Sequence, residues 1–184
     1  WPDWPGPALV LHGPEGCGKT HLAHVFAART GAVIIRATDL GLSDPPVLLE
    51  NAAVVVEDAD TGVDERALFH LYNAAKEAGR KLLITAQTAP SRWGLRLPDL
   101  RSRLSAAQQT AILPPDDTLM TALLVKLFTD RQLRVGPEVI SYLMGRMERS
   151  FHAARQVVAA ADALALAERR QVTVPLLRKV LGDV

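Results

Sequence analysis

The chain has 184 residues, of which 48% are hydrophobic and 22% charged, which suits one large domain or a core domain with a small satellite. With 21 Lys and Arg against 20 Asp and Glu its net charge is +1, so charge alone does not favour a nucleic-acid or membrane partner. Cys17 is the only cysteine, which excludes an intramolecular disulfide, and the apolar stretch at residues 157–167 is too short to span a bilayer. No signal peptide is visible. These features predict a cytoplasmic protein.

The first predicted strand, residues 7–12, leads into the glycine-rich sequence GPEGCGKT, and a helix is predicted over residues 19–29. The pattern G-x-x-x-x-G-K-[ST] between a strand and a helix is typical of a phosphate-binding loop, because glycines let backbone N–H groups approach phosphate oxygens. We expect Lys19 to contact the β- and γ-phosphates and the Thr20 hydroxyl to bind Mg²⁺. The helix N-terminus adds a favourable dipole. The predicted nucleotide ligands are Gly13, Pro14, Glu15, Gly16, Cys17, Gly18, Lys19, Thr20 and His21.

The segment before this strand, WPDWPGP, is too rich in proline for a helix or a central strand. We expect Trp1 and Trp4 to pack on a core, with the base side of the nucleotide as the alternative. A second strand is predicted over residues 32–38, followed by only a loop and a short helical turn over residues 39–50. The apolar face of the helix at residues 19–29 is predicted to comprise Leu22, Val25 and Phe26.

A third apolar strand ends in the acidic sequence Glu57-Asp58-Ala59-Asp60. Continuous hydrophobic strands are typical of parallel sheets covered on both faces, and such sheets place their chemistry at the carboxyl ends of the strands. Carboxylates there are suited to bind Mg²⁺ and to polarise a water. The alternative is that these acids only begin a turn and cap the next helix. Because a phosphate loop precedes them, we predict that Glu57 and Asp58 are catalytic and metal-binding.

The next segment, Thr61 to Asp64, resembles a capping box before a helix that ends at Gly79. Residues 81–86 predict a fourth strand that ends at polar Gln87, and residues 109–113 predict a fifth. Between them lie four arginines with few acids, namely Arg92, Arg96, Arg101 and Arg103. Five strands alternating with helices predict an α/β domain with a parallel sheet.

The sequence Pro114-Pro115-Asp116-Asp117 marks a boundary, because prolines stop the strand and aspartates cap the next helix. Beyond it only helical periodicity appears, with helix starts at Pro137 and at Val174. We therefore predict a small helical bundle over residues 115–184, after an α/β domain over residues 1–114.

This order of features resembles the AAA+ ATPase module. Within that family GPEGCGKTHLAHVFA resembles the initiator branch, and LPDLRSRLSA at residues 97–106 resembles DnaA and, more closely, its shorter Hda homologues. The resemblance covers about residues 7–181. It implies a five-stranded parallel P-loop sheet with flanking helices, followed by an all-α lid domain.

The resemblance also implies roles for individual residues. Residues 13–20 correspond to Walker A, and Glu57-Asp58 to Walker B, where the family usually has Asp first. In an alternative register Asp58 is the metal-side acid and Ala59 stands at the catalytic position. Gln87 corresponds to sensor 1.

Arg103 corresponds to the arginine finger, which acts on a neighbour's nucleotide; the alternative is a structural or solvated arginine. His152 stands at the sensor 2 position, and as an alternative it is simply a surface histidine. Arg149 and Arg155 are predicted to share its helical face and so could substitute for it.

The resemblance implies a regulator that binds ADP or ATP with Mg²⁺ and promotes hydrolysis of DnaA-bound ATP, which inactivates the initiator. Its own hydrolysis is expected to be weak because of Glu57. Family members act with the DNA polymerase sliding clamp through a short N-terminal peptide; residues 1–184 do not include such a peptide, so clamp binding is not predicted from them. We expect no direct sequence-specific DNA binding, because the sequence offers no basic recognition helix and no aromatic stacking platform, and self-association stays open. The alternatives are an autonomous AAA+ ATPase (a helicase loader or truncated initiator), a small-molecule kinase, and a nucleotide-gated binding module.

Overall fold

The computed structural model describes residues 4–182, and the chain divides into two compact units. We call residues 1–113 the α/β unit and residues 114–184 the lid unit. Within the described range no helix combines the length and the apolar character needed to cross a membrane.

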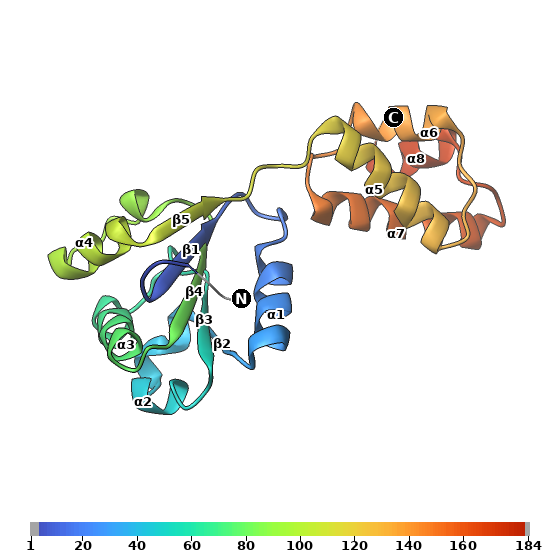
Figure 1. Ribbon diagram of the computed structural model, residues 1–184. Coiled ribbons are helices and arrows are strands. Elements are labelled where there is room, and N and C mark those ends of the chain that lie inside the picture. Colours follow the sequence, from blue (N-terminus) through green and yellow to red (C-terminus); the bar gives the residue numbers. More distant parts are fainter. Residues whose placement is uncertain (1–3, 183–184) are drawn as a thin grey trace. The chain divides into compact units, whose positions relative to one another are not determined.

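The α/β unit is built on a parallel sheet with the strand order β2-β3-β4-β1-β5 (Figure 1). Because β1 lies between β4 and β5, the loop after β1 adjoins the segments after both neighbouring strands. The prediction of a five-stranded parallel sheet with flanking helices is confirmed. The strands are β1 (Ala8–His12), β2 (Val33–Arg36), β3 (Ala53–Glu57), β4 (Lys81–Ala86) and β5 (Gln108–Ala111).

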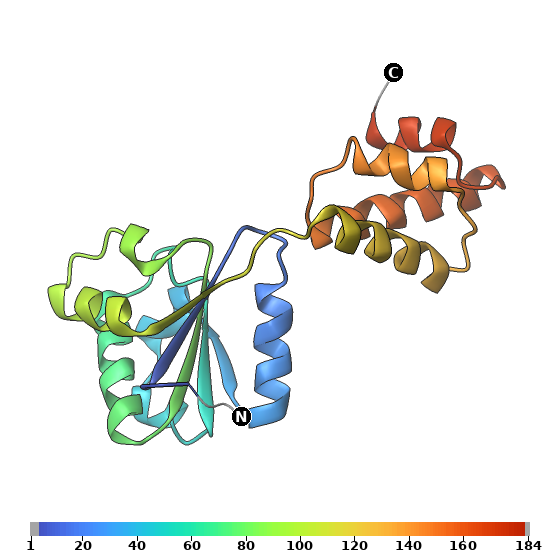
Figure 2. The ribbon, with the colours of Figure 1, turned by 45° about the horizontal axis from the view of Figure 1, so that its top comes forward.

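Helices cover both faces of this sheet (Figures 1 and 2). The helix α1 (Lys19–Thr30) lies on one face, and α2 (Pro45–Leu48), α3 (Glu65–Glu77) and α4 (Pro98–Ala106) lie on the other. Two short 3-10 helices, η1 (Ala37–Leu42) and η2 (Pro90–Arg92), complete the unit.

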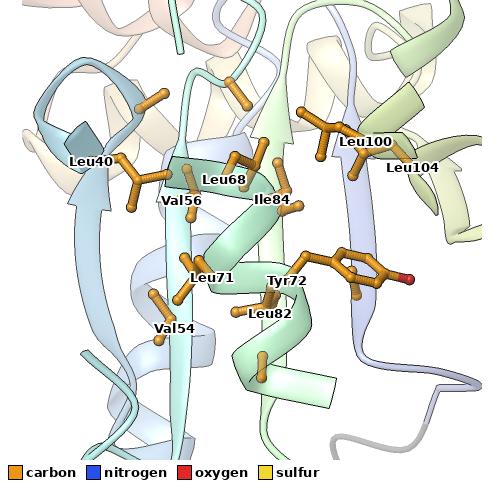
Figure 3. Close-up of a cluster of buried hydrophobic side chains, with 14 of the residues drawn as sticks. Leu40, Val54, Val56, Leu68, Leu71, Tyr72, Leu82, Ile84, Leu100 and Leu104 are labelled. Carbon is orange, nitrogen blue, oxygen red and sulfur yellow. The ribbon is translucent and has the colours of Figure 1, made fainter. Parts of the chain in front are cut away.

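Successive strand residues alternate between two cores, because side chains on a strand point to opposite faces. Val54, Val56, Leu82 and Ile84 pack with α3 and α4 (Figure 3), whereas Val55 and Leu83 of the same strands pack with α1. The central strands β3 and β4 are therefore buried on both sides, as the apolar strands predicted, whereas the edge strand β5 is exposed.

Two expectations for this unit are corrected. Leu22 is 45% exposed, and Ala23 takes its place beside Phe26 on the buried face of α1. The capping box is wrong in register: α3 begins at Glu65, and Asp64 is its N-cap, accepting from the N–H groups of the second and third residues after it. A carboxylate can cap a helix from this position directly.

Trp4 packs in the core beside α1, with its ring centroid 5.6 Å from that of Phe26. Its carbonyl accepts a hydrogen bond from Lys81, the first residue of β4, so it lies at the opposite end of the strands from the glycine-rich loop. The core-packing prediction is confirmed for Trp4, and Trp1 lies outside the described residues.

Residues 114–182, the described part of the lid unit, form four helices around one apolar core. Its core side chains recur at helical spacing, for example Met120, Leu124 and Phe128, which are all nearly fully buried. Asp116 caps the first helix by accepting from the N–H of Leu119. The helices are α5 (Asp117–Asp130), α6 (Pro137–Met144), α7 (Phe151–Glu168) and α8 (Val174–Leu181).

Candidate functional site

The loop between β1 and α1 has the backbone that its glycines permit. Gly16 and Gly18 have φ angles of 72° and 99°, a region that residues with a Cβ rarely adopt. Gly13 passes so close to the carbonyl oxygen of Ile112 that a Cβ would collide with it. The loop is therefore held against the segment after β5.

Lys19 lies inside this loop and is only 7% exposed. Its ammonium group donates to the carbonyl oxygens of Gly13 at 2.7 Å and Pro14 at 2.9 Å. Thr20 and His21 are exposed on the first turn of α1. The first turn of α1 has no side-chain N-cap and no acidic residue. Its backbone N–H groups and the helix dipole therefore favour an anion at this end of the helix.

The acids after β3 differ in their surroundings. Glu57 is the last residue of the strand, and its Oε1 is buried without a hydrogen-bond partner. Asp58 is exposed, with a φ of 57° that turns the chain sharply. Its N–H donates to the Thr85 hydroxyl at 3.1 Å, and the N–H of Ala59 donates to the Thr85 carbonyl at 2.9 Å. The acidic segment is thus attached to the end of β4.

A third acid, Asp60, holds the segment that contains Gln87. Its carboxylate accepts from the backbone N–H groups of Gln87 and Thr88, at 2.9 and 3.0 Å, and from the Thr88 hydroxyl at 3.2 Å. Sequence reasoning assigned Asp60 no role of its own, although its place in an acidic run at a strand end was the available signal. The Gln87 side chain itself is exposed.

The sheet register brings these segments together. His12 of β1 pairs with Ala86 of β4, and the N–H of Gly13 donates to the Ala86 carbonyl at 3.2 Å. The glycine-rich loop and Gln87 therefore come directly after paired residues. Because β3 is the other neighbour of β4, the acids lie at the same edge of the sheet.

Arg103 lies on α4 and is partly buried. Its guanidinium carbon is 5.1 Å from the ring centroid of Phe69 and 5.7 Å from that of Tyr72, both on α3. Nε is buried without a hydrogen-bond partner, whereas the terminal nitrogens are not among the buried unpaired atoms of residues 4–182. Burial raises the pKa of the Tyr72 hydroxyl, and the nearby guanidinium partly opposes that shift.

The loop before α4 is also attached to α3. The Glu65 carboxylate accepts from the N–H of Arg96 at 3.0 Å and from the N–H of Leu97 at 2.6 Å. The sequence did not reveal this contact, because it joins residues more than thirty positions apart.

In the lid unit, His152 and Arg155 are exposed near the start of α7. Arg149 does not share their helical face, because α7 begins at Phe151 with Ser150 as its N-cap. Its guanidinium instead forms an ion pair with Asp117 at 3.0 Å. That part of the sensor 2 prediction is corrected.

The arrangement in the α/β unit fits a bound nucleotide with a divalent cation. The loop backbone and the uncapped first turn of α1 supply N–H donors, and Lys19 supplies a cation. The unpaired Oε1 of Glu57 is an oxygen of the kind that Mg²⁺ prefers. Residues 4–182 contain no group of three or more His, Cys, Asp or Glu side chains placed to hold a metal; with nucleotides, Mg²⁺ is typically bound by one or two carboxylates together with phosphate oxygens.

Comparisons with known proteins give a family match for the lid unit and a sequence similarity over nearly the whole chain. Residues 116–181 match the family described as "Hda, lid domain". An uncharacterised protein of Haemophilus influenzae is 27% identical over 195 residues, which cover 98% of this chain and 84% of that protein. The family match covers most of the lid unit, and the similarity to the Haemophilus influenzae protein extends over nearly the whole chain.

Solved structures show the fold of the whole chain. Domain III of DnaA from Thermotoga maritima superposes with a TM-score of 0.78 at 17% identity, over 97% of this chain and 85% of that one. AMPPCP-bound DnaA from Aquifex aeolicus has a TM-score of 0.68 at 18% identity, over 89% of this chain and 59% of that one. The lid unit is thus similar to the Hda lid domain, and the chain has the fold of domain III of DnaA.

Proposed function

We propose that this protein binds an adenine nucleotide at residues 13–20 and presents Arg103 to the γ-phosphate of ATP bound by DnaA. Hydrolysis of that ATP would inactivate the replication initiator. The Hda-like lid and the similarity to DnaA, including structures with AMPPCP, support the nucleotide and the partner.

The observation that carries the proposal is the state of Arg103. Among residues 4–182 no acid forms an ion pair with it, and of its nitrogens only Nε is buried and unpaired. A structural arginine would normally direct its terminal N–H groups to carboxylates or carbonyls. Terminal groups left available suit a phosphate on another molecule, where a guanidinium stabilises the charge of the transition state.

Residues of the chain's own site have proposed roles as well. Lys19 and the N–H groups of the loop hold the phosphates, and Thr20, Glu57 and Asp58 are the candidates to hold Mg²⁺. When bound, the cation neutralises charge on the phosphates. Asp60 fixes the backbone at Gln87, so the side-chain amide of Gln87 extends from a backbone position that is itself fixed.

The test mixes DnaA loaded with radiolabelled ATP with this protein, the sliding clamp and DNA, and measures ADP formation on DnaA. We expect Arg103→Ala to lower the stimulated rate by roughly 10³-fold, the lower end for arginine fingers. Arg101→Ala removes an exposed arginine two positions away and is the matched control. A rate that Arg103→Ala leaves intact would contradict the assignment.

Hydrolysis by the chain itself is the second candidate function, and the buried, unpaired oxygen of Glu57 favours it. Single-turnover hydrolysis by the purified protein without DnaA measures it directly. We expect slow turnover. Brisk turnover that Glu57→Gln abolishes and Arg103→Ala does not change would favour the autonomous ATPase over the regulator.

A further inference from the structure

One face of α3 contacts α4 and the loop before it. Glu65, Phe69 and Tyr72 are spaced four and three residues apart, which places them on the same side of a helix. Glu65 binds the backbone just before α4, and the two rings contact the guanidinium of Arg103 near the end of that helix. Residues of α3 therefore fix both the start of α4 and the side chain of Arg103.

The two rings hold the guanidinium in a way that leaves its donors available. A guanidinium binds an aromatic ring through its flat face, whereas its five N–H donors lie in its plane and point outward from the edge. Nε is covered, and the terminal nitrogens are not buried and unpaired. An arginine held by a carboxylate would instead have these donors occupied.

We propose that Phe69 and Tyr72 are positioning residues that hold Arg103 with its terminal N–H groups directed at the partner's phosphate. The inference rests on the proposed function. We call the two rings the aromatic cradle. A free arginine side chain samples many rotamers, and fixing it before docking removes that entropic cost from the transition state.

The cradle is tested by measuring stimulated ATP hydrolysis on DnaA as a function of the concentration of this protein. Phe69→Leu and Tyr72→Leu keep apolar bulk but remove the rings, and we expect each to lower the maximal rate roughly 5- to 30-fold. The concentration for half-maximal stimulation should stay within about twofold, since the docking surface is retained. Tyr72→Phe keeps the ring and should restore the maximal rate.

A matched control removes a comparable contact elsewhere. In the lid unit the guanidinium carbon of Arg146 lies 4.4 Å from the ring centroid of Tyr142. Tyr142→Leu should leave the maximal rate unchanged. An equal loss in Tyr142→Leu and Phe69→Leu would assign the effect to general destabilisation and overturn the cradle.

A second measurement uses side-chain NMR on the isolated protein, in the same form as in the hydrolysis assay. The ring faces should shift the side-chain NMR signals of Arg103 upfield, and Phe69→Leu should abolish that shift while the thermal transition is retained. A parent chain that does not stimulate DnaA contradicts the proposed function. A parent chain that does, with Phe69→Leu and Tyr72→Leu at its full maximal rate, overturns only the cradle.

Discussion

The two units use charged side chains in different ways. In the α/β unit Lys19, Asp60 and Glu65 bind backbone atoms, so each charge has a fixed place relative to the sheet. In the lid unit the ion pairs join side chains on the surface, such as Lys126 with Asp130 at 2.9 Å. Exposed pairs of this kind contribute little stability. Both units are stabilised by apolar cores, and only in the α/β unit do charged side chains also fix the backbone around the glycine-rich loop.

The largest expected effect is in the core of the lid unit. Phe128 is 1% exposed, and Phe128→Ala should lower the free energy of unfolding of this unit by about 3–5 kcal/mol, because it removes buried apolar surface and leaves a cavity. The tryptophans of the described residues, Trp4 and Trp93, belong to the α/β unit. Tryptophan fluorescence should therefore report an unchanged transition while circular dichroism at 222 nm reports early loss of helix. Coincident shifts of both signals would show that the units unfold together.

A smaller loss is expected when a backbone-binding carboxylate is removed. Asp60→Ala leaves the N–H groups of Gln87 and Thr88 without their acceptor, and should destabilise the α/β unit by about 2–3 kcal/mol. The matched change in the lid unit is Asp116→Ala, which removes one exposed helix cap and should cost about 1 kcal/mol. Chemical denaturation monitored by fluorescence and by circular dichroism measures both losses. Equal losses would contradict the distinction between the units.

A glycine in each unit allows a further test of this difference. Gly13→Ala places a Cβ against the Ile112 carbonyl and should destabilise the α/β unit by about 1–3 kcal/mol and weaken binding of a fluorescent ATP analogue. Gly145 in the lid unit has a φ of −84° and no neighbour closer than 3.7 Å to an added Cβ. Gly145→Ala should leave stability unchanged or raise it slightly. Nucleotide binding that survives Gly13→Ala unchanged would argue against the loop as the binding site.

The smallest effect concerns an exposed pair. A hydrogen bond from Lys179 at 2.7 Å lowers the pKa of the Glu168 carboxyl. A lowered pKa means that this contribution is present above the ordinary glutamate pKa of about 4.3 and is lost as the pH falls through the folded-state value. Lys179→Met should raise the pKa of Glu168 in an NMR titration, with hardly any change in Tm. A marked loss of stability at neutral pH would show that surface charge matters in this unit after all.

Much of the architecture was predictable because it depends on local patterns. The fourth strand was predicted with the bounds it has, since polar residues come directly after a run of apolar ones. Helix starts at Pro137 and Val174 were predicted from proline near the first turn and are confirmed. The acids after β3 could be placed near the loop, because the carboxyl ends of parallel strands share one edge of a sheet.

Errors arose where two local patterns compete. The capping box over Thr61 to Asp64 predicted a helix start at the threonine, whereas Asp64 is the N-cap of α3 and accepts from the N–H groups of Arg66 and Ala67. Arg149 was assigned to the helical face of His152 by spacing alone. Ser150 is the N-cap of α7, so Arg149 precedes the helix. Helix periodicity does not by itself locate the first residue of a helix.

The phosphate loop, the order of strands and helices along the chain, and the resemblance to a family could all be recognised from local sequence patterns. The contacts of Asp60 with the Gln87 segment, and of two rings of α3 with the guanidinium of Arg103, became visible only in the folded structure. The two groups of features differ in how far apart in the sequence the interacting residues lie. A loop and its flanking elements are encoded by neighbouring residues, whereas these contacts join residues that become neighbours only when the sheet and its covering helices have formed.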